Sequence, residues 1–166
     1  MSSRFMHSIR PATVEDVPLL RAMIQELAEF ERLGDAVIIT EEDLRRDGFG
    51  PNPKFRALIA EWEGQPAGYA RFFGFYSTFE GKPGIFLEDL FVREKFRGKG
   101  LGKALLVRVA RMARQENCLG LRWEVLDWNS RAIEFYMSLG AEFRDGWRVV
   151  MLQDDAFHAI ADEARG

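Results

Sequence analysis

The stretch Phe96–Lys103, with the sequence FRGKGLGK, decides the fold because two kinds of element meet there. Before it, Ile85–Val92 (IFLEDLFV) is an apolar run typical of a buried strand, and after it Ala104–Glu116 carries apolar residues at helical spacing. Glycines allow left-handed backbone and the close approach of a ligand. Free N–H groups at a helix start, with basic side chains around them, favour an anion. The stretch therefore predicts a strand, a phosphate-binding turn and a helix.

The turn does not fit the common nucleotide-binding motifs. A P-loop needs glycine where Arg97 stands, and serine or threonine where Ala104 stands. A dinucleotide fingerprint that begins at Gly98 needs a third glycine where Lys103 stands. The pattern [RQ]-x-x-G-x-[GA] does fit, with Arg97, Gly100 and Gly102 at its fixed positions.

Hydrophobic periodicity and turn residues on both sides of this stretch predict a succession of strands and helices. Further strands are expected at Phe5–Arg10, Phe55–Trp62, Pro66–Tyr76, Leu121–Leu126, Ala141–Phe143 and Trp147–Leu152. Helices are expected after the caps Thr13 and Thr40, over Ser130–Leu139 and over Asp155–Ala164. This order predicts an α/β fold with a mixed, twisted sheet and helices on both faces.

Composition bounds the function by exclusion. The 166 residues suit a single domain over 1–166, with its core at about 8–152, and the net charge of −3 gives no footprint for nucleic acid. One cysteine, Cys118, and two distant histidines, His7 and His158, argue against a disulfide framework, a metal cluster and a serine-type triad. No apolar run is long enough for a membrane span, and a lone cysteine fits a cytoplasmic protein.

A second motif follows the predicted strand Leu121–Leu126. Asn129–Ala141 has the pattern N-x-x-A-x-x-x-Y-x-x-x-G-A, and with the turn it resembles the GCN5-related N-acetyltransferases (GNAT). Nearly the whole chain, from Ile9 to Leu152, is similar to the diamine acetyltransferases, which act on spermidine and spermine and have thialysine-acetylating relatives. The segments that carry this similarity are Ile9–Thr13, Glu26–Glu31, Asp47–Gly50, Phe86–Val92 and Gly146–Arg148.

The resemblance implies the GNAT acyl-CoA N-acyltransferase fold, acetyl-CoA as co-substrate, no metal, and a homodimer. In that fold the strand Ile85–Val92 carries a β-bulge and splays from Leu121–Leu126, so that the pantetheine arm docks as an extra strand. An N–H near Leu90 then bonds the thioester oxygen. The implied co-substrate contacts are Leu90, Phe91, Val92, Arg97, Gly98, Lys99, Gly100, Leu101, Gly102, Lys103, Asn129, Ser130, Arg131, Ala132 and Tyr136.

The same resemblance assigns the catalytic roles. Tyr136 is the candidate general acid, because a phenol stays protonated at neutral pH and can donate to the leaving thiolate. Glu88 is the candidate base, acting directly or through water. The implied substrate-binding residues are Phe30, Glu31, Glu88, Asp89, Arg122, Trp123 and Glu124. Acids suit a cationic amine, whereas Arg122 opposes a polyamine. Asp89 is also a candidate for a purely structural salt bridge, since buried carboxylates need partners.

The leading hypothesis is therefore an acetyl-CoA-dependent N-acetyltransferase. It would act by direct attack in a ternary complex on a primary amine of a small cationic substrate, such as a polyamine, a diamine or a thialysine-like amino acid. Two alternatives remain. One is an acetyltransferase of a protein lysine or N-terminus, and the other is a non-catalytic CoA-binding module. No nucleic acid and no membrane are expected among the partners.

Overall fold

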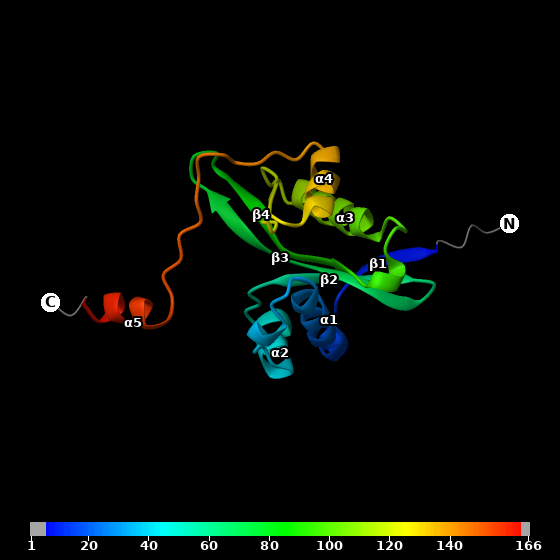
Figure 1. Cartoon of the computed structure of the whole chain (residues 1–166), viewed down its shortest axis with the longest axis horizontal. Helices are drawn as coiled ribbons and strands as arrows, with labels where there is room; N and C mark the ends of the chain where they lie inside the picture. Colours follow the sequence, from blue (N-terminus) through cyan, green and yellow to red (C-terminus); the bar gives the residue numbers. More distant parts are fainter. Residues whose placement is uncertain (1–5, 164–166) are drawn as a thin grey trace. The chain divides into compact units, whose positions relative to one another are not determined.

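The computed structural model describes residues 6–163. The chain forms two compact units, residues 1–126 and residues 127–166, which are described separately. Figure 1 traces the elements of both units in chain order. Phe5 and Ala164, which the sequence assigned to the first strand and the last helix, lie outside the described residues.

The first unit is built on a five-stranded sheet in the order β1-β2-β3-β4-β5. The first four strands pair antiparallel, and β5 pairs parallel with β4, so the predicted mixed sheet is confirmed. A tight turn joins β2 to β3, and a longer hairpin joins β3 to β4 (Figure 1). The strands are β1 (His7–Pro11), β2 (Arg56–Trp62), β3 (Gln65–Ser77), β4 (Lys82–Val92) and β5 (Leu121–Arg122).

Helices cover both faces of this sheet, as the sequence predicted (Figure 1). On one face lie α1 (Val17–Phe30) and α2 (Glu41–Phe49). Their apolar side chains form one buried cluster with Tyr69 of β3, Phe91 of β4 and Phe55, which immediately precedes β2. On the other face lies α3 (Leu101–Gln115), whose buried stripe is Leu101, Leu105, Leu106, Val109 and Ala113. Short 3₁₀ helices precede or link these elements at η1 (Val14–Asp16), η2 (Gly34–Ala36) and η3 (Glu94–Phe96).

The predicted caps are present at the starts of the first two helical segments. The backbone N–H of Thr13 donates to Asp16 Oδ2 at 2.8 Å. At α2 the bonds are reciprocal, because Asp43 N donates to Thr40 Oγ1 at 3.1 Å and Thr40 N donates to Asp43 Oδ2 at 2.9 Å. Asp16, only 8% exposed, also accepts two hydrogen bonds from Arg10 of β1, at 2.7 and 2.8 Å, which ties the helix start to the sheet edge.

The second unit contains α4 (Ser130–Ser138) and α5 (Asp154–Glu163). Two predictions are wrong here, because Ala141–Phe143 and Trp147–Leu152 are not strands in the structure. A strand exists only where its backbone pairs with a neighbour, and alternating apolar residues do not by themselves supply that neighbour. For the same reason the predicted strand Leu121–Leu126 is reduced to the two residues of β5 that pair with β4.

Candidate active site

Strand β4 separates from β5 after a very short ladder. Ile85 pairs with Leu121 and Phe86 pairs with Arg122, and no described residue pairs with 87–92 on that edge of the sheet. On its other edge β4 stays paired with β3 as far as Val92. A row of backbone N–H and C=O groups is therefore open to an extended ligand, which would pair with it as an added strand. The predicted splay is confirmed.

A bulge lies in the middle of β4, as predicted. Arg71 of β3 pairs with Asp89, while the next residue, Phe72, pairs with Leu87. Glu88 is consequently the extra residue of β4. A bulge interrupts the ladder and re-aims backbone and side-chain groups, and bulges occur often beside active sites. The bulge thus leaves Glu88 without a partner residue on β3. It does so on the strand whose other edge, toward β5, is unpaired beyond Phe86.

The glycine-rich turn has the form expected for an anion site. Gly98 and Gly100 have φ angles of 75° and 80°, and a Cβ at either position would meet no heavy atom within 4 Å. Ala104 N donates to Gly100 O at 3.0 Å and closes the first turn of α3. The N–H groups of the three residues before Ala104 therefore have no acceptor inside the helix. Open space in front of positive-φ glycines and free N–H groups fits a phosphate.

The basic side chains of the turn have different surroundings. Arg97 Nε donates to Val92 O at 2.9 Å, and its guanidinium lies 4.7 Å from the centre of the Phe30 ring. Arg97 therefore fastens the turn to the end of β4 and to the end of α1. Lys99 Nζ lies 4.8 Å from the centre of the Trp62 ring, a cation–π contact at the surface.

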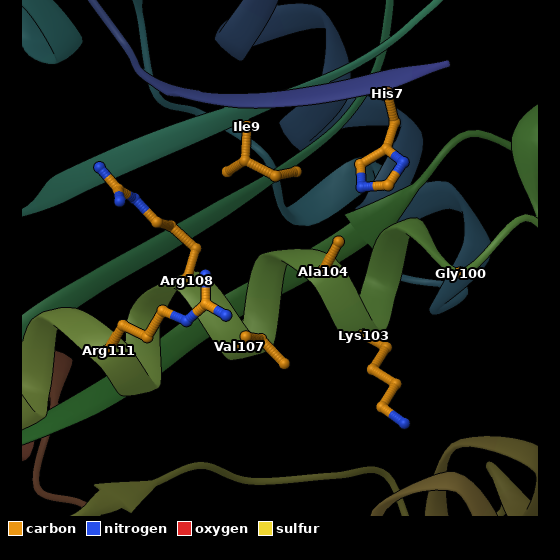
Figure 2. A pocket seen from close by; sticks show the side chains of 8 residues that line it. All are labelled: His7, Ile9, Gly100, Lys103, Ala104, Val107, Arg108 and Arg111. Carbon is orange, nitrogen blue, oxygen red and sulfur yellow. The ribbon is translucent and has the colours of Figure 1, made fainter. Parts of the chain in front are cut away.

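A groove of about 480 Å³ runs beside this turn, between β1 and α3 (Figure 2). His7 and Ile9 of β1 face α3 across it, and the side chain of Lys103 extends away from β1. The groove is lined by His7, Ile9, Gly100, Lys103, Ala104, Val107, Arg108 and Arg111. Three lysine or arginine side chains among these residues give the surface next to the turn a positive potential, which favours an approaching anion.

Asp89, the neighbour of Glu88, is held by two side chains of β3. Arg71 Nε donates to Asp89 Oδ2 at 2.7 Å, and the hydroxyl of Tyr69 donates to the same oxygen at 3.1 Å. Tyr69 is fully buried, and burial beside the Asp89 carboxylate holds the pKa of its hydroxyl far above the ordinary value. Asp89 therefore forms the structural salt bridge for which the sequence made it a candidate. Its role as a substrate contact stays a prediction.

Glu88 is less constrained. Its Oε1 lies 3.9 Å from Arg71 Nη2, and 43% of its side chain is exposed. Partial burial raises the pKa of Glu88, Arg71 opposes this rise, and the charges of Asp89 and Glu124 add to it. A carboxylate with a raised pKa is a better proton acceptor near neutral pH than an ordinary surface glutamate.

Glu31, the residue that follows α1, is affected by the same charges. Its pKa is raised first by partial burial and then by the charges of Asp89 and Glu88. The structure thus brings together three of the predicted substrate-binding acids, from the end of α1 and from the β4 bulge. The charge of Glu124, which follows β5 in the chain, also raises the pKa of Glu88. This concentration of negative charge favours a cationic group.

The remaining predicted substrate-binding residues also belong to the first unit. The guanidinium of Arg122 lies 4.3 Å from the centre of the Phe75 ring, and Trp123 is partly buried. Phe30 is 42% exposed beneath Arg97. The direction of these side chains relative to a substrate stays a prediction.

The second motif forms the start of α4 in the second unit. Asn129 caps the helix, because its Oδ1 accepts from Ala132 N at 3.3 Å. Ser130 and Arg131 are exposed in the first turn, and Tyr136 lies beside Phe135 with ring centres 5.4 Å apart. Gly140 follows the helix with a φ of 85°, as expected at its C-terminus. The motif is thus a capped helix that carries Tyr136, whose role as acid stays a prediction.

Sequence reasoning did not single out Arg71 and Tyr69. Both precede the recognised strand, and neither belongs to a motif. Their spacing of two residues on β3 puts them on one face of the sheet, which was a usable signal. Their pairing with Asp89 depends on the register across the bulge, and that register is visible only in the structure.

Within residues 6–163 no group of three or more histidine, cysteine, aspartate or glutamate residues could hold a metal ion. None of the helices described for these residues is long and apolar enough to cross a membrane.

Known sequences and structures resemble this chain over most of its length. Residues 20–141 match the model of the acetyltransferase (GNAT) family. A thialysine N-epsilon-acetyltransferase of Sus scrofa is 40% identical over 164 residues, covering 92% of this chain and 96% of that protein. An L-ornithine N5-acetyltransferase of Arabidopsis thaliana is 32% identical and covers 95% of this chain and 89% of that protein. A spermidine/spermine N(1)-acetyltransferase-like protein of Homo sapiens is 36% identical, over 85% of this chain and 22% of its own length.

Solved structures support the same fold. An integron cassette protein from the mobile metagenome of V. cholerae superposes with a TM-score of 0.80, at 23% identity, covering 95% of this chain and 98% of that one. An aminoglycoside acetyltransferase from an uncultured soil sample superposes with a TM-score of 0.75, at 18% identity, covering 92% of this chain and all (100%) of that one. At these identities the likeness concerns the fold.

Proposed function

Because this chain belongs to the GNAT family and is an N-acetyltransferase, we propose that it transfers the acetyl group of acetyl-CoA to a primary amine of a small cationic substrate. One observation carries the proposal: the open edge of β4 and the half-exposed carboxylate of Glu88 occur in the same short segment of one strand. An acyl donor along that edge would bring its thioester close to a proton acceptor. The substrate class follows from the acids at the site and from relatives named for thialysine, spermidine or spermine, and ornithine.

The co-substrate would be held mainly by backbone groups. The pyrophosphate would accept from the N–H groups of the turn 98–103, with the basic groove beside it, and the pantetheine arm would pair with Leu90–Val92. The interrupted ladder at Glu88 supports an N–H near Leu90 as the donor to the thioester oxygen. The family motif adds contacts from the start of α4: Asn129, Ser130, Arg131 and Ala132.

The chemistry requires three proton movements: the attacking nitrogen loses two protons and the departing sulfur gains one. A primary ammonium has a pKa of about 10.4, so it must lose a proton before it can attack. Glu88 would take this proton, directly or through a water. The amine lone pair then attacks the thioester carbon in a ternary complex, so that a C–N bond forms and the C–S bond breaks. Tyr136 would donate its hydroxyl proton to the departing sulfur, and the second proton of the new amide nitrogen would pass to the Tyr136 phenolate, directly or through water, which restores the phenol. None of these movements needs a metal or a covalent acyl-enzyme.

Selectivity for a cation would come from the electric field of the site. Glu31, Glu88 and Glu124 would attract a substrate ammonium, and Phe30 and Trp123 would pack on its methylene chain. Arg122 and Arg71 moderate this field. Because these two positive charges weaken the negative potential of the site, we expect it to favour a substrate with one or two positive charges over a long polycation.

Organisation of the molecule is part of the proposal. The family match over 20–141 crosses the boundary between the two compact units, which supports a single catalytic domain. We also propose a homodimer, as the diamine acetyltransferase resemblance implies. A cytoplasmic location agrees with the single cysteine.

An acetylation assay with purified protein tests this function. Acetyl-CoA is supplied with spermidine, spermine, ornithine, thialysine and a lysine peptide, and free CoA and acetylated product are measured. At least one small amine is expected to react. Tyr136→Phe should lower kcat by about 10²-fold, and Glu88→Gln should act similarly at neutral pH.

Tyr76→Phe is the matched control, because Tyr76 is an exposed tyrosine of β3 that has no part in the proposed chemistry. Its kcat should equal that of the wild type. Unchanged turnover in Tyr136→Phe would remove the acid role. CoA binding without product on any amine would favour the binding module, and reaction with the peptide alone would favour a protein-directed enzyme.

A further inference from the structure

Arg71 is the cationic side chain that faces both carboxylates of the β4 bulge. Its Nε donates to Asp89 Oδ2 at 2.7 Å, and its Nη2 lies 3.9 Å from Glu88 Oε1. In a regular strand, consecutive side chains point to opposite faces, and one guanidinium could serve only one of them. The extra residue at Glu88 removes this restriction. A single arginine therefore stands beside both acids.

The guanidinium is fixed by contacts other than the one to Glu88. Asp89, its main partner, is itself held by the buried Tyr69 hydroxyl. The guanidinium also lies 5.4 Å from the centre of the Phe55 ring, and only 26% of the Arg71 side chain is exposed. The framework of the sheet thus determines where the positive charge stands.

Glu88 makes a looser contact with this fixed charge than Asp89 does. A separation of 3.9 Å is too long for a hydrogen bond, yet the Coulomb attraction between the two charges is still appreciable. The carboxylate can therefore turn toward an amine or a water without breaking a bond, and Arg71 still stabilises its negative charge.

Among the described residues, the other charged groups that act on Glu88 are acids. They are Asp89 on β4, Glu31 at the end of α1 and Glu124 after β5. Each of them disfavours a negative charge at Glu88, and so does partial burial, so that Arg71 is the group that works in the opposite sense. Without this cation the pKa of Glu88 would be higher, so that Glu88 would become protonated, and unable to accept a proton, at a higher pH.

We propose that Arg71 is a positioning residue of the reaction: anchored by Asp89 and Tyr69, it keeps Glu88 in the carboxylate form that accepts the proton of the amine substrate. The kinetic consequence rests on the proposed function, whereas the ionisation of Glu88 is a property of the protein alone. The two can therefore be tested separately.

The first experiment follows the carboxyl carbon of Glu88 by NMR during a pH titration of the free protein, with Glu88→Gln used to assign the signal. In Arg71→Met the titration midpoint should rise by about one pH unit, because a neighbouring opposite charge has been removed. Arg71→Lys, which keeps the charge, should restore most of the difference. Arg71→Gln, whose amide can still donate to Asp89, is a second uncharged variant in case Arg71→Met does not fold.

The matched control is Arg56→Met. Arg56 lies on β2, forms a salt bridge with Glu116, which follows α3, and stacks on the ring of Phe72. Phe72 lies on the opposite face of the sheet from Phe55. Its removal should leave the Glu88 titration where it is. Circular dichroism and thermal unfolding establish that each variant is folded.

The second experiment measures kcat/KM against pH. The acidic limb of the profile should move up by the same amount of about one unit in Arg71→Met, so that the loss of kcat/KM is largest on that limb, at most about ten-fold, and recovers at higher pH. The double variant Arg71→Met/Glu88→Gln should be no slower than Glu88→Gln. A purely structural role would instead lower the rate at every pH.

The outcomes separate the two claims. An unchanged Glu88 titration in folded Arg71→Met and Arg71→Gln overturns the inference, whether or not the protein is active. A shifted titration with an unshifted kinetic profile in an active enzyme overturns it as well. If the wild type acetylates no amine, the proposed function fails, and the titration still decides whether Arg71 controls Glu88.

Discussion

Two carboxylates at this site have surroundings that disfavour their charged form. Partial burial and mutual repulsion raise the pKa values of Glu31 and Glu88. A carboxyl group whose pKa is raised by folding lowers the stability of the folded state once the pH exceeds its ordinary pKa, because its charge is better solvated in the unfolded chain. A bound ammonium would relieve this cost. Affinity for the amine and stability of the free protein should therefore oppose each other at these residues.

Glu31→Gln should show this opposition. At pH 7.5 the melting temperature should rise by about 1–2 °C, and the rise should vanish near pH 3.5, where the carboxyl group is protonated in both states. The KM for the amine should rise about five-fold, which corresponds to roughly 1 kcal/mol for a partly exposed ion pair. Calorimetry at both pH values and steady-state kinetics measure these effects.

Glu29→Gln is the control for that prediction, because Glu29 is an exposed acid in the last turn of α1, two residues before Glu31. It should change neither the melting temperature nor the KM appreciably. A Glu31→Gln protein with lower stability at pH 7.5, or with an unchanged KM, would contradict the interpretation of Glu31 as a strained substrate contact.

The sequence alone predicts candidate residues only where they lie within motifs. Glu88 and the bulge around it followed from the resemblance of Phe86–Val92, and the structure shows the bulge. Arg71 could not be found in this way, because its importance depends on which residue of β4 stands opposite it. A shift of one residue in the register would have paired Arg71 with Glu88 instead of Asp89.

At the scale of elements, the turn before α3 needs a left-handed backbone conformation at Gly100 and leaves free space in front of that residue. Gly100 has a φ of 80°, and a methyl group there would meet no protein atom. Gly100→Ala should therefore cost about 1–2 kcal/mol of stability through backbone strain alone. It should also raise the Kd for CoA by about ten-fold or more, because the added carbon would occupy the space in front of the N–H groups.

Gly64→Ala separates these two effects. Gly64 lies in the β2–β3 turn with a φ of 77°, and a Cβ there also meets nothing within 4 Å. Its loss of stability should match that of Gly100→Ala, while CoA binding should stay at the wild-type value. Isothermal titration calorimetry and urea unfolding measure both quantities. Equal CoA affinities in the two variants would argue against a phosphate site at the turn.

The start of α1 depends on a charged cap. Hydrogen bonds from Arg10, and a further one from the Thr13 backbone, hold the pKa of Asp16 below its ordinary value despite burial. A lowered pKa contributes stability that is present above the ordinary pKa and is lost as the pH falls through the lowered one. Asp16→Asn should cost about 2 kcal/mol at pH 7, and the difference from the wild type should shrink as the pH falls below the ordinary aspartate pKa of 3.8.

Asp43→Asn serves as the comparison, because Asp43 caps α2 in the same way but at an exposed position. Its effect should be clearly smaller. Urea unfolding curves at pH 7 and at low pH give both values. An Asp16→Asn cost that does not depend on pH would show that packing, rather than ionisation, stabilises this helix start.

Elements were predicted well where they rest on local chemistry. The caps, the glycine-rich turn and the helices that follow them lie where Thr13, Thr40, Gly100 and Asn129 indicate, because these residues act on their own neighbourhood. The strands expected over 141–143 and 147–152 were wrong because strand formation depends on a distant partner. Local alternation carries no information about that partner.

At the scale of the whole molecule, the second unit contains an apolar run that is well exposed. The exposed fractions are 71% for Trp147, 71% for Val149, 90% for Val150 and 66% for Met151. A second copy of the chain that covered this run would remove apolar surface from water. Light scattering after size-exclusion chromatography should therefore give twice the mass of one chain.

Val150→Asp should shift that equilibrium toward the monomer, because burying an unpaired charge at the contact is costly. Asp155→Asn, a change at an acidic residue of α5, should leave the mass unchanged. A monomeric wild type at micromolar concentration would contradict the homodimer proposal without affecting the assignment to the family.

The open edge of β4 has a consequence for how the protein behaves when it stands empty. An unpaired row of backbone groups on a sheet is a template on which another polypeptide can add, and natural proteins normally shield such rows. Here the acyl donor itself would be the shield. Preparations stripped of nucleotide should then precipitate faster on storage than donor-saturated ones at the same temperature. Cellular supply of the donor would thus govern the lifetime of the enzyme as well as its rate.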